Sequence, residues 1–82
     1  MKHTHIKYWF IANARGITQQ QICDHANINN GMMSHWLTGK SRPNAKNCII
    51  FCKAISEMTN EPFDKLIVTL MYAIACDIGI EL

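Results

Sequence analysis

The segment from residue 28 to residue 43, INNGMMSHWLTGKSRP, concentrates side chains that donate and accept hydrogen bonds. Helical spacing places four of them on one side of a short helix: Asn30, Ser34, His35 and Thr38. Met33 and Trp36 lie on another side, where they can anchor the helix to a core. An asparagine amide can bind an adenine edge with two hydrogen bonds, and short polar groups near a helix N-terminus suit the major groove of DNA. These residue types therefore indicate a hydrogen-bonding surface on an apolar base.

Positive charge follows this segment in the chain. Residues 1–56 carry seven Lys and Arg side chains against one acid, Asp24, which gives this part a formal charge of +6. Residues 57–82 carry five acids against Lys65 and have a formal charge of −4. Such an uneven distribution predicts that an anionic partner binds at one end of the molecule only.

The elements that must position these groups are predicted to be helices, because strand signals are nearly absent. Apolar spacing predicts five of them, over residues 5–14, 18–27, 29–38, 44–56 and 62–78. At 82 residues the chain is too short for a second core, so we expect one domain over residues 1–82.

Start and stop signals frame the second and third helices. Thr18 and Gln21 form the T-x-x-Q pattern of a capping box, in which each side chain accepts a hydrogen bond from the other residue's backbone N–H. Asn27 tolerates the left-handed conformation of a tight turn, and Asn29 is a good N-cap. Gly39 is expected to end the third helix.

The apolar residues of each helix predict its inner face. For the first helix these are Tyr8, Ile11 and Ala12, and for the second Ile22, Cys23 and Ala26. For the third and fourth they are Met33, Trp36, Leu37, Cys48, Phe51, Cys52 and Ile55. We expect Leu37 to pack against the fifth helix, and Pro43 to lie well placed for the first turn of the fourth.

Residues 17–43, ITQQQICDHANINNGMMSHWLTGKSRP, resemble the Xre-type, lambda-repressor-like family of DNA-binding domains. The family motif runs roughly L-T-Q-x-x-L-A-x-x-x-G-V-x-x-x-x-I-S-x-W-x-x-G-x-x-x-P. Ten residues match it in order without a gap: Ile17, Thr18, Gln19, Ile22, Ile28, Met33, Ser34, Trp36, Gly39 and Pro43. The resemblance covers residues 6–56 and implies a helix-turn-helix over residues 18–38. Together with the fifth helix, which is predicted from the apolar residues alone, we expect an all-α, compact five-helix, lambda-repressor-like domain.

The resemblance also implies a function, that of a sequence-specific, repressor-like regulator of transcription that binds double-stranded DNA. We expect it to act as a homodimer on a pseudo-palindromic operator, because the chain has more apolar surface than so small a domain easily buries. The residues that would read bases are Asn30, Gly31, Ser34 and His35. Those that would contact the DNA backbone are Thr18, Gln19, Asn29, Thr38, Lys40 and Arg42. Four positions depart from the family. Asn27 replaces the usual glycine, Gly31 lacks a side chain where a base reader often lies, His35 replaces the commoner Arg or Lys, and Leu37 is apolar where a polar residue is usual.

The fifth helix has apolar residues on more than one face, and two interpretations stay open. It is either the central core helix or a core helix whose second face forms a homodimer. The residues expected in such a dimer interface are Leu66, Leu70, Met71, Ile74 and Ile78. The alternative function is an antitoxin or another protein-interaction module that uses this helix to bind a partner such as a toxin.

Other classes of protein find no support in the sequence. The four cysteines form no CxxC pair and lie in apolar stretches, so we expect buried free thiols, no metal and no cofactor. We find no sign of an enzyme, because the sequence has no clustered carboxylates, no phosphate-binding glycine loop and no nucleophile with a placed base. The N-terminus lacks a signal-peptide pattern, and the fifth helix is a poor membrane span, which favours a cytoplasmic protein with no membrane partner.

Overall fold

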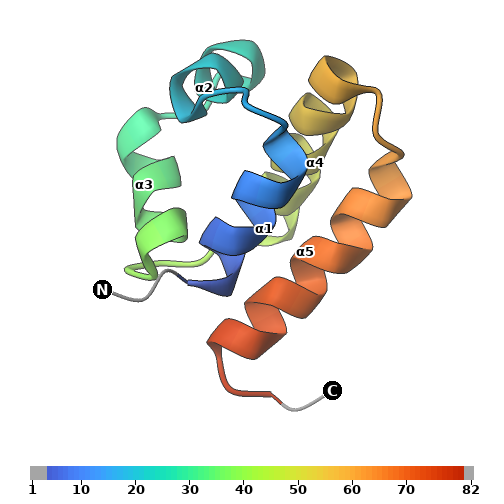
Figure 1. Ribbon diagram of the computed structural model, residues 1–82. Coiled ribbons are helices and arrows are strands. Elements are labelled where there is room, and N and C mark those ends of the chain that lie inside the picture. Colours follow the sequence, from blue (N-terminus) through green and yellow to red (C-terminus); the bar gives the residue numbers. More distant parts are fainter. Residues whose placement is uncertain (1–3, 81–82) are drawn as a thin grey trace.

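The computed structural model describes residues 4–80, which form five helices and no strand (Figure 1). The helices are α1 (His5–Ala14), α2 (Gln19–Ala26), α3 (Asn30–Thr38), α4 (Ala45–Thr59) and α5 (Phe63–Asp77). The all-helical prediction is confirmed, and only the end of α4 lies more than a residue or so beyond its predicted bounds. Figure 1 shows α3 and α5 on opposite sides of the molecule, and the contacts agree, since α3 packs on α1 and α2 while α5 packs on α1 and α4.

The predicted helix caps of α2 and α3 are confirmed. The Thr18 hydroxyl accepts from the backbone N–H of Gln21, and the Gln21 side chain accepts from the N–H of Thr18 at 2.8 Å. The Asn29 side chain caps α3 by accepting from the N–H of Met32. Pro43, by contrast, lies before the first turn of α4 and is buried, because Asn44 takes the N-cap position.

Three residues, 27–29, connect α2 to α3. Asn27 has φ 57°, the left-handed conformation that its residue type allows without a glycine. The backbone N–H groups of Asn27 and Ile28 both donate to the carbonyl of Cys23, which closes the end of α2. Ile28 is buried beneath the turn, so the turn is held from inside and both helices keep fixed directions.

The core is built around Phe51 of α4. Its ring contacts those of Trp9, Phe10 and Trp36, with centroids 5.4–6.1 Å apart, so it joins α1, α3 and α4. The residues predicted for the inner faces of α2, α3 and α4 are buried, apart from Ala26, which is partly buried and packs against the core. Aromatic contacts of this kind carry much of the packing energy of so small a domain.

The inner face predicted for α1 is wrong. Tyr8 and Ile11 are 57% and 55% exposed, and Ala12 is also exposed. Ile6, Trp9, Phe10 and Ala14 are buried instead. Apolar residues surround this helix on all sides, so the sequence contains no periodicity that selects one face, and the packing against Phe51 decides.

The N-terminus of α1 is fixed by residues from three parts of the chain. The Thr4 hydroxyl accepts from the N–H of Lys7 and donates to the carbonyl of Leu37 at 2.8 Å, at the end of α3. The Asp77 carboxylate, at the end of α5, accepts from the N–H groups of His5 and Ile6 at 2.7 and 3.1 Å. These bonds satisfy the first three N–H donors of α1 and tie α3 and α5 to the same helix end.

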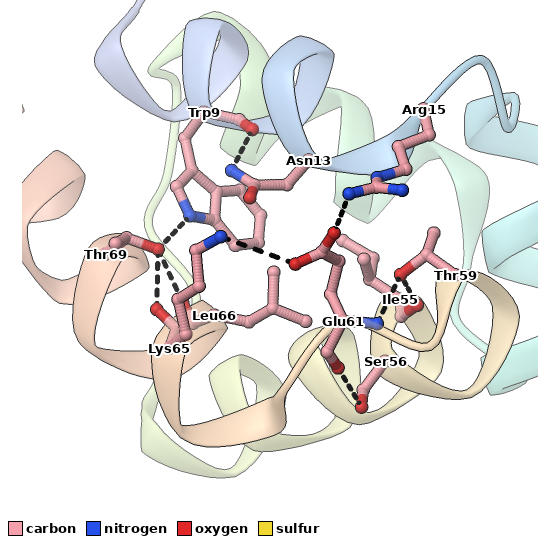
Figure 2. Close-up of polar contacts among 10 residues, drawn as sticks. All are labelled: Trp9, Asn13, Arg15, Ile55, Ser56, Thr59, Glu61, Lys65, Leu66 and Thr69. Carbon is pink, nitrogen blue, oxygen red and sulfur yellow. Dashed lines mark hydrogen bonds and ion pairs between the residues drawn. The ribbon is translucent and has the colours of Figure 1, made fainter.

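The junction between α4 and α5 is also tied to α1 (Figure 2). The Glu61 side chain forms ion pairs with Arg15, at the end of α1, and with Lys65 of α5. Trp9 donates from its indole N–H to the Thr69 hydroxyl at 2.8 Å. α5 is therefore held to α1 along its length by polar contacts as well as by packing.

Candidate nucleic-acid interface

α3 has a buried apolar side and a polar side that faces solvent, as the sequence predicted. Met33, Trp36 and Leu37 are buried, whereas Asn30 and His35 are exposed and Ser34 is half-buried. The contact expected between Leu37 and the fifth helix is wrong, because α3 packs on α1 and α2 and α5 lies beyond them. The polar side of α3 is thus presented to solvent by a helix that is anchored along its opposite side.

Gln19 connects α2 to the polar side of α3. Its amide nitrogen Nε2 lies 2.8 Å from Oδ1 of Asn30, 3.2 Å from the Asn30 carbonyl and 2.7 Å from the Ser34 hydroxyl. The structure therefore brings together two predicted base readers and one residue predicted to contact the DNA backbone. Because the side-chain donors of Gln19 are used here, its side chain has only the acceptor Oε1 left, and an acceptor cannot bond a phosphate oxygen.

A buried thiol lies below this cluster. Sγ of Cys23 is 3.6 Å from Oδ1 of Asn30 and 3.8 Å from the Met33 sulfur. Burial raises the pKa of the Cys23 thiol, and the nearby Asp24 carboxylate raises it further, so the group is a neutral S–H donor. The sequence placed Cys23 in the core, and no periodicity could show that it reaches Asn30.

Gly31 has a structural use that the sequence did not indicate. A Cβ built at this position would lie 3.0 Å from Oδ1 of Asn29, the atom that caps α3. The missing side chain therefore leaves room for the cap, and Gly31 contributes no side-chain hydrogen-bonding group to the exposed side of α3.

The other residues predicted to contact a DNA backbone surround α3. Thr18 and Asn29 are exposed at the N-termini of α2 and α3, where each side chain accepts one backbone N–H. Thr38 is exposed at the other end, and its hydroxyl donates to the Ser34 carbonyl at 2.8 Å. The Nδ2 group of Asn29 has no partner within residues 4–80, which leaves it free to donate outward.

Unpaired cations continue this surface beyond the end of α3. Lys40 and Arg42 are exposed in the loop that follows Gly39, and Lys46 is exposed in the first turn of α4. In the part of the chain that the structure describes, none of the three forms an ion pair with a carboxylate. Their charge adds to the partial positive charge of the α4 N-terminus, so the positive potential here is not compensated locally.

α5 corrects the predicted dimer interface. Leu66 and Leu70 are 0% exposed because they form part of the hydrophobic core of the chain itself. They therefore cannot contact a partner. Ile74 is partly buried against that core, whereas Met71 and Ile78 are exposed. The outer side of α5 has a shallow apolar depression. It is lined by the exposed residues Val68, Met71 and Tyr72 and by the partly buried Ala75.

The cysteines are all free, but they are not alike. Cys23, Cys48 and Cys52 are buried, as predicted, and burial raises the pKa of Cys48 and, together with the neighbouring Cys48 thiol, raises that of Cys52 to about 12. Cys76 is exposed, which the apolar stretch around it did not predict. No group of three or more His, Cys, Asp and Glu side chains that could hold a metal ion occurs among residues 4–80.

Two observations concern the chain as a whole. No helix of the described residues combines the length and the apolar character that crossing a membrane requires. Comparison with protein-family models, with curated proteins and with solved structures finds no match. A function must therefore be inferred from the residues and geometry of the interface itself.

Proposed function

We propose that the protein is a sequence-specific, repressor-like regulator that binds double-stranded DNA through α2, the turn and α3, in the manner of lambda-repressor-like helix-turn-helix domains. One observation carries the proposal. α3 is held by Met33, Trp36 and Leu37 on its buried side, and its opposite side presents the joined amides and hydroxyl of Gln19, Asn30 and Ser34. A rigid helix with short polar groups on its free side is what reading a major groove requires.

The charge distribution supports the same surface. Lys40 and Arg42 follow α3 directly and have no carboxylate partner within residues 4–80, so phosphates can bind them without breaking an ion pair. Each such contact releases condensed counterions and makes affinity fall with salt. By contrast, Arg15 and Lys65, which lie away from α3, are paired with Glu61.

We further propose that the protein acts as a homodimer through the outer side of α5. Val68, Met71 and Tyr72 are 43–54% exposed there, and α5 carries no charged residue between Lys65 and Asp77. A contiguous apolar surface of this kind is typical of protein interfaces. To lie in successive major grooves of a pseudo-palindromic site, the two α3 helices of such a dimer would have to be about 34 Å apart.

The test is selection from random duplex DNA at a fixed salt concentration, with the wild-type protein and two variants. Asn30→Ala should relax the preference at one base position. Lys40→Ala should weaken binding to all sequences alike and lower the slope of log affinity against log salt by about 1. Lys53→Ala is the matched control, because Lys53 is an exposed cation in the C-terminal half of α4, in the groove beside Glu57 and Phe63. Failure of the wild-type protein to enrich any motif would contradict the proposal.

The exposed side of α5 also favours a second candidate function, an antitoxin or other interaction module that binds a partner protein there. Sedimentation of the wild-type chain and of Met71→Glu separates the two uses of this surface. A dimer that Met71→Glu dissociates supports the homodimer, whereas a monomeric wild-type chain leaves the surface to a different protein. Ile11→Glu on α1 is the control, since Ile11 is also an exposed apolar residue and lies on a different helix.

A further inference from the structure

The structure fixes which way the amide of Asn30 is turned. Nε2 of Gln19 lies 3.2 Å from the backbone carbonyl of Asn30, which is only an acceptor, so this Gln19 atom must be a donor. The Asn30 side-chain atom 2.8 Å from the same nitrogen must then be the acceptor Oδ1. The orientation of both amides follows from one backbone group.

The acceptor capacity of Asn30 is used within the protein. Oδ1 accepts from Gln19 on one side, and Sγ of Cys23 lies 3.6 Å away as a second, weaker donor. Sγ carries one hydrogen, and the Met33 thioether 3.8 Å away is a weaker acceptor than an amide oxygen, so this hydrogen is directed at Oδ1 and both lone pairs of that oxygen have a donor beside them. Within residues 4–80, Nδ2 of Asn30 has no partner, so the exposed end of this side chain offers two N–H donors and no free acceptor.

The neighbouring groups have the same character. The Ser34 hydroxyl accepts from Gln19, which leaves its own hydrogen free to donate. Nδ2 of Asn29 is a free donor at the start of α3. The polar side of α3 is therefore rich in donors, and its partner should be rich in acceptors.

We infer that Asn30 reads guanine and not adenine. Reading adenine with an asparagine needs a free acceptor for the N6 amino group, which Asn30 lacks while it is bound to Gln19 and Cys23. Guanine presents two adjacent acceptors in the major groove, N7 and O6, and no donor, so Nδ2 can donate to this edge without meeting another N–H. Gln19 is thus a positioning residue that sets the specificity of Asn30. The inference rests on the proposed function, since it concerns the same α3 surface.

The test compares motifs selected by the wild-type protein and by Asn30→Ala, which identifies the base position that depends on Asn30. That position should be guanine, and its replacement by adenine should weaken wild-type binding roughly 5- to 150-fold. Replacement by 7-deazaguanine, which lacks the N7 acceptor, should weaken binding by the wild-type protein but not by Asn30→Ala. Adenine at this position, or a motif in which no position depends on Asn30, would overturn the inference and leave DNA binding intact.

Gln19→Ala gives an independent readout. Removal of its amide frees Oδ1 of Asn30, so adenine should become accepted beside guanine while pyrimidines stay disfavoured. A variant that only loosened α3 would lose preference among all four bases, which would contradict the positioning role. Gln20→Ala is the matched control, because its amide bonds Asp24 within α2 at 2.8 Å and should leave the preference unchanged. If the wild-type protein enriches no motif at all, the proposed function fails and the inference fails with it.

Discussion

Replacement of Asp77 by asparagine should destabilise the protein by about 1–2 kcal/mol near neutral pH. The carboxylate accepts from the N–H groups of His5 and Ile6, which have no partner within α1 itself. An amide in its place would offer one acceptor oxygen and turn an NH2 donor toward the second N–H, so a helix cap is lost, an effect of about 0.5–2 kcal/mol. The ion pair with the His5 ring contributes little, because that ring is 60% exposed.

The stability difference between the wild-type protein and Asp77→Asn should depend on pH. Partial burial acts to raise the pKa of Asp77, but the hydrogen bonds from His5 and Ile6 outweigh it, and the pKa lies below its ordinary value of 3.8. A lowered pKa in the folded state means that ionised Asp77 stabilises the fold fully above 3.8 and that this contribution is lost as the pH falls through the folded-state value. The gap between wild-type and Asp77→Asn stability should therefore be constant near neutral pH and shrink in acid.

Urea unfolding followed by tryptophan fluorescence measures the gap, with Trp9 and Trp36 as buried reporters. In thermal unfolding the same loss should lower Tm by roughly 4–16 °C at neutral pH. Asp24→Asn is the control, because Asp24 is exposed and its one hydrogen-bond partner among the described residues is Gln20 in its own helix, and the substitution should cost less than about 0.5 kcal/mol. Equal stability of wild-type and Asp77→Asn protein, or a gap that persists undiminished in acid, would refute the reasoning.

Three further predictions concern the contacts around α5. Thr69→Val removes the acceptor of the Trp9 indole N–H, and Trp9 is only 6% exposed, so the free energy of unfolding measured in urea should fall by about 1–3 kcal/mol. Thr69→Ser keeps the hydroxyl and should retain most of the wild-type stability. A disulfide reagent should react rapidly with one thiol per folded chain, and Cys76→Ser should abolish this fast phase, because the three other thiols are buried with raised pKa values. Glu61→Gln should cost less than about 1 kcal/mol, and still less at high salt, because its cationic partners Arg15 and Lys65 are mostly exposed.

The features that the sequence predicted correctly depend on residues close together in the chain. Thr18 and Gln21 are three apart, and Asn27 and Asn29 lie next to the helix ends that they close. Capping and turn formation are local, so the residue types at those positions suffice. The buried sides of α3 and α4 were also predicted correctly. Each of these helices has one apolar stripe, and the spacing of its residues along the chain identifies it.

The buried faces of α1 and α5 were predicted wrongly because several faces of each helix are apolar. α1 has apolar side chains on all sides, and its packing against α4 and α5, including the contact of Trp9 with Phe51, determines that Trp9 is buried and Tyr8 is exposed. α5 has the same ambiguity, which assigned Leu66 and Leu70 to a partner although they fill the core. Periodicity measures how apolar residues are distributed around a helix, and it cannot choose a face when the distribution is broad.

The polar contacts that matter most for the candidate site lie beyond both kinds of pattern. Gln19 and Asn30 are each sound predictions for a DNA contact taken singly, yet the crossing of α2 and α3 makes them partners of one another. Once they are joined, the side-chain donors of Gln19 and the acceptor of Asn30 are no longer available to a ligand, and under the proposed function the base that we expect Asn30 to read changes from adenine to guanine. Residue type limits which hydrogen bonds a side chain can make, but the fold decides which of them remain for a ligand.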